Sequence, residues 1–142
     1  MRTAGIAVAL LASVSLCAAC ATDRYGGGRA LAEYQRYAGP PIDEFRYATF
    51  DGWEVVGRDR VVLFVDVNQA YLLTVMQPCV DLGFTEHLAV SETLHAISRF
   101  EALFPERRER CPIDEIRHID LKQLKADRAA ARAAAKAAPA PN

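Results

Sequence analysis

Three short apolar segments joined by tight turns constrain the fold of this chain most. Residues 53–56, 61–66 and 70–76 are rich in β-branched, aromatic and leucine side chains. The connections at 57–60 and 67–69 are too short for a crossover helix, so neighbouring strands pair in antiparallel fashion and the region predicts a meander. Successive apolar positions in 61–66 indicate a central strand that is buried on both faces.

A fourth strand is expected just before the meander. Residues 45–50 are rich in aromatic side chains, and Asp51-Gly52 is a two-residue hairpin signal that leads into residues 53–56. The expected fold is mainly β, with α+β at the margin: a small antiparallel meander sheet or a partly open barrel. A signal helix precedes it and an alanine-rich helix follows it.

The pattern is less regular between residues 79 and 116. Residues 79–84 start as a loop, and residues 111–116 are expected to form a short closing element. Apolar residues within 91–104 fit helical spacing, but 94–103 also fits a strand that crosses the sheet. Periodicity alone leaves helix and strand open for this segment.

Cys79 and Cys111 are the two cysteines in the body of the chain. In an oxidising compartment an even pair of this kind predicts a structural disulfide. Two buried thiols or a metal site are the alternatives. His87, His95 and His118 follow none of the common ligand spacings, so we expect no metal and no cofactor.

The compartment follows from the first twenty residues, which have the layout of a bacterial signal peptide. Arg2 precedes an apolar run over residues 4–16, and this run of 13 residues is shorter than the roughly 20 that cross a bilayer. Export is therefore predicted.

Two processing sites compete at the end of this leader. Cys17-Ala-Ala-Cys20 resembles the lipobox of bacterial lipoproteins, in which Cys20 becomes the lipidated first residue, although Cys17 stands where the lipobox usually has leucine. Ala19-Cys-Ala21 is instead a site for ordinary signal peptidase, and a cut after Ala21 releases a soluble periplasmic protein. The resemblance to lipoproteins favours lipidation of Cys20 and anchoring at the outer membrane. The C-x-x-C spacing of the two cysteines also matches a redox motif, but no strand precedes it and no helix follows it.

Four segments are therefore expected. They are a signal peptide (1–19), a spacer with a short helix near residues 30–37 (20–41), a β-rich domain (42–120) and a basic, alanine-rich helical tail (121–142).

Charge divides the chain unevenly between body and tail. Residues 21–120 hold 11 basic and 17 acidic side chains, whereas residues 121–142 hold five basic and one acidic. The acidic body and the export signal argue against nucleic-acid binding. The tail cations are spaced three or four residues apart, on one helix face. They offer a contact for anionic lipid headgroups or cell-wall polymers, or they form a solvated low-complexity tail. These cations are Lys122, Lys125, Arg128, Arg132 and Lys136.

Candidates for chemistry are few. Asp114, Glu115, His118 and Asp120 lie close together in sequence and could form an acid/base cluster. A solvated polar face is the simpler interpretation, because no nucleophile or oxyanion motif accompanies them.

Four aromatic side chains raise the possibility of a ligand groove. Trp53, Phe64, Tyr71 and Phe84 could line such a groove, but aromatic residues in strands more often belong to the core.

Several of these motifs together resemble a known family. Phe45-Arg-Tyr47, Phe50-Asp-Gly-Trp53, Tyr71-Leu-Leu73, Pro78-Cys79 and Cys111-Pro-Ile113 are similar to a family of small exported proteins of Gram-negative bacteria, described only as a domain of unknown function. The resemblance covers residues 43–120 and leaves out the tail.

The resemblance implies a small β-rich domain with paired cysteines, matched here by Cys79 and Cys111. It also favours a strand for residues 94–103. It implies no activity, cofactor or catalytic residue.

The leading hypothesis is a non-enzymatic accessory or binding module, lipid-anchored in the cell envelope. The alternatives are a soluble periplasmic enzyme that uses the Asp114/Glu115/His118 region, and a structural link to the cell wall through the basic tail. The sequence does not fix the oligomeric state.

Overall fold

The computed structural model describes residues 28–138, which form nine strands, two α-helices and one short 3-10 helix. Along the chain these elements are α1 (Arg29–Arg36), β1 (Ala38–Ile42), β2 (Glu44–Arg46), β3 (Gly52–Gly57), β4 (Arg60–Asp66), β5 (Gln69–Val75), η1 (Asp81–Phe84), β6 (Leu88–Val90), β7 (Ala96–Ser98), β8 (Ala102–Pro105), β9 (Cys111–Ile119) and α2 (Leu121–Ala137).

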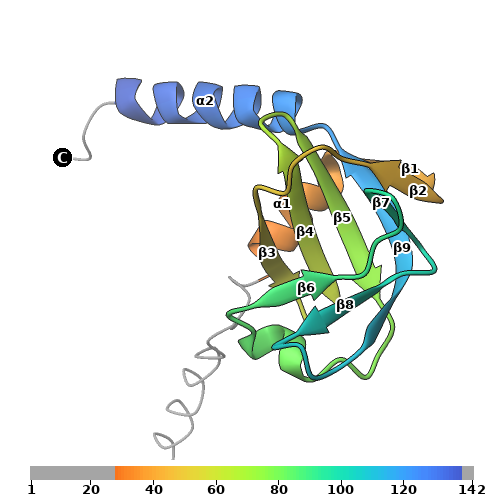
Figure 1. Ribbon diagram of the computed structural model, residues 1–142. Helices are drawn as coiled ribbons and strands as arrows, with labels where there is room; N and C mark the ends of the chain where they lie inside the picture. The colour runs from red at the N-terminus through yellow and green to blue at the C-terminus, as the bar shows by residue number, and fades with distance from the viewer. Residues whose placement is uncertain (1–27, 139–142) are drawn as a thin grey trace, which may run out of the picture.

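Six strands form a nearly closed antiparallel barrel in the order β3-β4-β5-β9-β8-β6 (Figure 1). β9 pairs with β5 along one edge, and along its other edge with β8 near Cys111 and with β1 near Ile119. β2 and β7 form a separate two-stranded sheet. The predicted fold class, mainly β with a partly open barrel, is confirmed.

The predicted meander is confirmed for β3, β4 and β5. Arg58 and Asp59 turn the chain between the paired residues Gly57 and Arg60, and Val67 and Asn68 turn it between β4 and β5. The next partner of β5 is β9, which lies far along the chain.

The central strands are buried on both faces, as their continuous apolar pattern predicts. Val61, Leu63 and Val65 of β4 point into the barrel, where they pack with residues of β5, β8 and β9. Val62 faces the other way, into a second cluster outside the barrel wall. Both faces of β4 therefore need a cover, and the helices supply the outer one.

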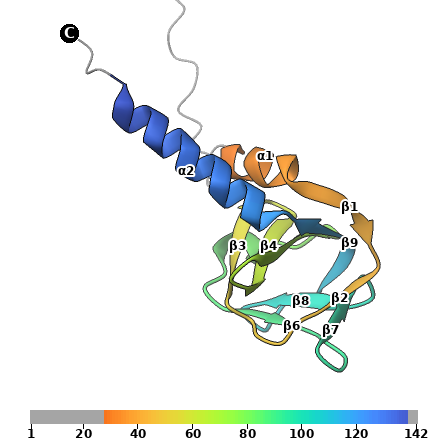
Figure 2. The ribbon, with the colours of Figure 1, turned by 90° about the horizontal axis from the view of Figure 1, so that it is seen from above.

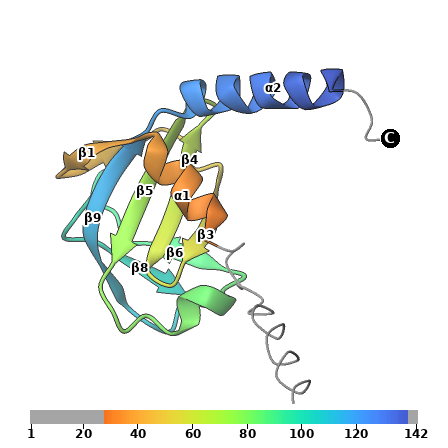
Figure 3. The same ribbon diagram turned by 180° about the vertical axis from the view of Figure 1, so that it is seen from behind.

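α1 and the first turns of α2 cover this outer face (Figures 2 and 3). Tyr34 of α1 and Leu121 and Leu124 of α2 are buried there together with Leu72 of β5. Part of the segment assigned to a spacer is thus folded onto the barrel as α1 and β1. The C-terminal helix is confirmed; it begins after Asp120, whose carboxylate accepts a hydrogen bond from the Gln123 N–H at 2.9 Å.

The predicted hairpin between residues 45–50 and 53–56 is wrong. β2 pairs with β7, and Phe45 stacks on Tyr71 inside the barrel with ring centroids 3.7 Å apart. The Asp51 N–H donates to the Phe64 carbonyl at 2.8 Å, so Asp51 and Gly52 already lie along β4 instead of turning the chain. Burial of the Phe45 ring outweighs the local turn signal.

The ambiguous segment 91–104 forms two short strands, β7 and β8, separated by a turn. The strand favoured by the family resemblance is therefore right in type, but it is not continuous, and no helix forms there. Residues 111–116 are more than the short closing element expected: they belong to nine-residue β9, which joins both halves of the barrel. Within residues 28–138, no helix is both long and apolar enough to cross a membrane.

Candidate functional site at the seam of the barrel

The barrel remains open between β3 and β6, its two terminal strands, and we call this opening the seam. A cavity of about 540 Å³ lies there, within the range typical of small-ligand sites. Its wall combines apolar and charged side chains from β3, from the start of β6 and from the turn after β8. The lining residues are Trp53, Glu86, His87, Leu88, Ala89, Glu106 and Arg107.

The floor of this site is a turn with unusual backbone geometry. Glu106 and Arg107 have φ angles of 49° and 58°, in the left-handed region that non-glycine residues rarely adopt. Such a conformation costs roughly 1–3 kcal/mol per residue and persists only where surrounding contacts fix it.

The Glu106 carboxylate supplies those contacts. Its Oε1 atom accepts hydrogen bonds from the backbone N–H groups of Glu86 at 2.6 Å and His87 at 3.1 Å. The Glu106 N–H in turn donates to the His87 carbonyl at 2.9 Å. These bonds fasten the turn to the residues that lead into β6, and the two backbone N–H donors lower the pKa of the Glu106 carboxyl below its usual value.

Replacing this carboxylate, as in Glu106→Gln, should remove a pH-dependent part of the stability. Because the pKa of Glu106 is lowered by folding, its charged form contributes stability above the unfolded-state pKa, and this contribution disappears as pH falls through the folded-state value. Urea unfolding at a series of pH values should therefore show the wild type more stable than the variant near pH 7, and the difference should shrink as pH falls below the usual pKa of a glutamate. Glu86→Gln is the matched control, since the Glu86 carboxylate has no hydrogen-bond partner among residues 28–138. A constant difference at every pH would contradict this role.

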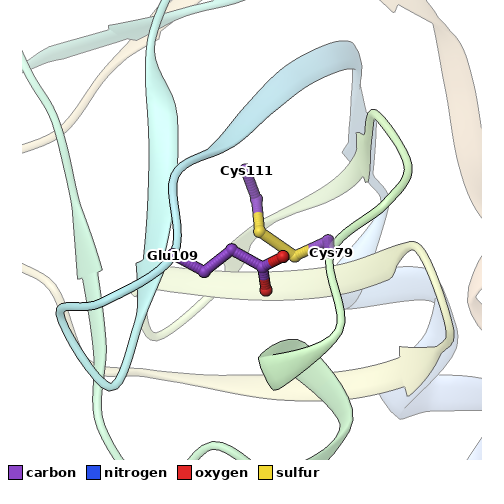
Figure 4. A group of neighbouring side chains, drawn as sticks. All are labelled: Cys79, Glu109 and Cys111. Carbon is purple, nitrogen blue, oxygen red and sulfur yellow. A yellow bond between two sulfur atoms is a disulfide. The ribbon is translucent and has the colours of Figure 1, made fainter.

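The predicted disulfide forms beneath the same turn. Cys79 and Cys111 are bonded to each other, and both are buried, with 3% and 0% of their surface exposed. Figure 4 shows the carboxylate of Glu109 beside the two sulfur atoms. The three side chains lie close enough to hold a metal ion, with ligand atoms within 4.8 Å of one another. The sulfurs are joined to each other, however, so neither is a free thiolate that could bind a metal. Glu109 also accepts a hydrogen bond from the Asp81 N–H at 2.9 Å, which ties the turn to η1.

The proposed acid/base residues have separate surroundings. Glu115 pairs with Arg117 at 2.6 Å, and Asp120 caps α2. His118 lies on the other face of β9 from Glu115 and packs edge-on against Tyr71, with ring centroids 5.3 Å apart. Asp114 is exposed. The structure therefore gives Glu115 and Asp120 structural partners and does not bring them together with His118.

The four aromatic residues considered for a groove also separate. Trp53 lines the seam cavity. Tyr71 lies in the barrel interior, and Phe64 contacts the Tyr34 ring edge-on in the outer cluster. Phe84 is exposed, at 64%. Only Trp53 among them is a lining residue of the described cavity.

The basic residues of the tail fall into two groups. Arg128 forms two hydrogen bonds to Glu33, each 2.8 Å, and lies over the Tyr34 ring, while Lys125 bonds to the Val67 carbonyl. Lys122, Arg132 and Lys136 are exposed. Part of the predicted basic face therefore holds α2 against α1 and the β4–β5 turn.

The sequence predictions missed most of the cavity residues. No glycine or asparagine marks the left-handed positions at Glu106 and Arg107, and His87 entered the sequence analysis only as a metal ligand that was set aside. Cys20, the predicted lipidation site, lies outside the described residues.

A family model described as a family of unknown function, DUF6491, matches residues 2–135. The chain belongs to this family. The match is wider than the resemblance noted over residues 43–120, since it takes in most of the leader and nearly all of α2. No curated protein and no solved structure matches the chain.

Proposed function

We propose that this protein is an exported lipoprotein of the bacterial cell envelope, anchored at the outer membrane through Cys20, and that its barrel is a non-enzymatic binding module. The observation that carries the binding role is the cavity at the seam. It combines the Trp53 ring and the apolar start of β6 with the charged groups of Glu86 and Arg107. Apolar walls with a few polar groups are typical of pockets that bind ligands.

The Cys79–Cys111 disulfide supports the export half of this proposal. Disulfides persist in oxidising compartments and are rare in the bacterial cytosol. A bond between two cysteines that are both nearly inaccessible to solvent is a structural staple of the kind found in secreted domains. It agrees with the leader pattern, which was inferred from different residues.

The distal half of α2 supports a surface contact in addition. Beyond Arg128 the helix extends away from the barrel, and Arg132 and Lys136 are exposed on it (Figures 1 and 3). Cations on such a projecting helix suit anionic lipid headgroups or cell-wall polymers. In this proposal the distal part of α2 orients the barrel against the envelope. Lys125 and Arg128 instead hold the first turns of α2 against the rest of the fold.

Lipidation is tested by Cys20→Ser in cells grown with radiolabelled palmitate. The wild type should incorporate label and the variant should lose it, because the thiol of Cys20 is the acceptor in the lipobox interpretation. Cys17→Leu is the matched control: it brings the sequence closer to the usual lipobox and should keep the label. Label that persists in Cys20→Ser would contradict the proposal, as would an unlabelled wild-type protein whose mature chain begins after Ala21 by mass spectrometry.

A further inference from the structure

β6 presents an unpaired strand edge to the seam. Within residues 28–138 its only strand partner is β8. The N–H of Glu106 donates to the His87 carbonyl and the N–H of Ser91 donates to the Ala102 carbonyl, each at 2.9 Å, so residues 87 and 91 direct their backbone groups toward β8. Alternate residues of an antiparallel strand point opposite ways. The N–H and C=O groups of Leu88 and Val90 therefore face the seam.

Apart from its length of three residues, this edge has none of the usual protection against strand addition. Proteins commonly block a free edge with lysine, proline or a bulge. β6 consists of leucine, alanine and valine, and its register with β8 is unbroken from Leu88↔Pro105 to Val90↔Leu103. Leu88 and Val90 also pack on the barrel core, which holds the edge rigid. Two donors and two acceptors are thus fixed in position beside the cavity.

The turn after β8 brings exposed arginine side chains to the same end of β6. Its sequence, Glu106-Arg-Arg-Glu-Arg110, is nearly balanced in charge. The structure separates the two kinds of side chain, because Glu106 and Glu109 direct their carboxylates to backbone N–H groups of residues 86, 87 and 81. Arg107, Arg108 and Arg110 are exposed and have no acidic partner among the described residues. Arg107 lines the cavity itself, and Arg108 and Arg110 follow it in the same turn.

We propose that the seam binds an extended, acidic peptide segment of a partner protein, which adds to β6 as a further strand. The inference rests on the binding role proposed for the seam and names its ligand class. Main-chain hydrogen bonds to Leu88 and Val90 hold the segment, the Trp53 side of the cavity receives an apolar side chain, and the arginines of the turn select carboxylates.

Three synthetic octapeptides test this. They share an alternating valine-threonine body and end in two glutamates, two lysines or two serines. The ¹⁵N-labelled protein, purified as cells process it, is titrated with each. The glutamate peptide should bind about tenfold more tightly than the lysine peptide, and its affinity should fall with added salt. At saturation it should slow hydrogen exchange at the Leu88 and Val90 amides, because both become hydrogen-bonded.

Two sets of variants separate the contribution of the β6 backbone to peptide binding from that of the arginine charges. Val90→Pro removes an N–H that has no partner in the described fold, and proline is tolerated on such an edge, so it should weaken all three peptides about tenfold. Val90→Ala keeps the N–H and should bind like wild type. Replacing Arg107, Arg108 and Arg110 with glutamine should abolish the preference for the glutamate peptide. Replacing Lys122, Arg132 and Lys136 with glutamine removes the same charge elsewhere and should keep it.

Three other results would each contradict one part of the proposal. Equal affinity for the three peptides would overturn the acidic ligand class. If no peptide slowed hydrogen exchange at the Leu88 and Val90 amides, strand addition would be overturned. The lipoprotein proposal would be unaffected, because palmitate labelling of Cys20 tests it separately. Protection that rises with protein concentration in the absence of peptide would instead assign the edge to a second copy of this chain.

Discussion

Replacing Cys79 and Cys111 together with alanine should lower the free energy of unfolding by about 3–4 kcal/mol. The disulfide joins residues 32 positions apart and so restricts the unfolded chain over a long loop. It also ties the end of the meander to the first residue of β9. Guanidinium unfolding of wild type and variant under identical conditions measures the difference.

Reduction provides the matched control for this prediction. Wild type treated with dithiothreitol should lose about as much stability as the double variant, and the variant should not respond to dithiothreitol. The segment that the disulfide encloses, residues 80–110, contains β6, β7 and β8. Identical unfolding midpoints for oxidised and reduced wild type would show that the bond contributes nothing to the barrel.

Leu124→Ala should have a second large effect, a loss of about 2–5 kcal/mol. Leu124 has no exposed surface and packs in the outer cluster with Tyr34 of α1 and Val62 of β4. Truncation leaves a cavity between α2 and the barrel wall, in addition to the lost burial. Chemical unfolding again gives the magnitude, and circular dichroism reports whether α2 itself remains helical.

An exposed leucine supplies the control. Leu94 is 82% exposed, so Leu94→Ala removes the same atoms without opening a cavity and should change the stability by less than about 0.5 kcal/mol. Equal effects of the two substitutions would mean that α2 does not pack on the barrel in solution.

Local patterns predicted the elements whose partners are close in sequence. The meander β3–β5 and helix α2 follow from side-chain alternation, short turns and helix-forming residues, and each agrees with the structure. The hairpin at Asp51-Gly52 failed because its decisive contact, the stacking of Phe45 on Tyr71, joins residues that no local window includes. β9 was underestimated for the same reason, since its length is set by pairing with three other strands.

The seam was harder to predict than the fold. Glu106 and Arg107 adopt left-handed backbone conformations, which in a sequence are usually indicated by glycine or asparagine. Here hydrogen bonds to residues 86 and 87 stabilise the turn, so no such residue marks it. Composition also does not show that Arg107, Arg108 and Arg110 lack acidic partners among residues 28–138, whereas Glu106 and Glu109 are hydrogen-bonded to backbone N–H groups. The Cys79–Cys111 pair, in contrast, could be inferred, since compartment and cysteine count together suffice.

The pairing of the earliest strand with the last one dictates an order of assembly. β1 lies against β9, and the Glu33–Arg128 pair links residues 95 positions apart. An emerging chain can form the β3–β5 meander as soon as residue 75 is available. It cannot close the barrel wall or cover Val62 until β9 and the first turns of α2 have followed. Completion of the fold therefore waits for nearly the whole polypeptide, because the contacts that close the barrel wall join residues far apart in the sequence.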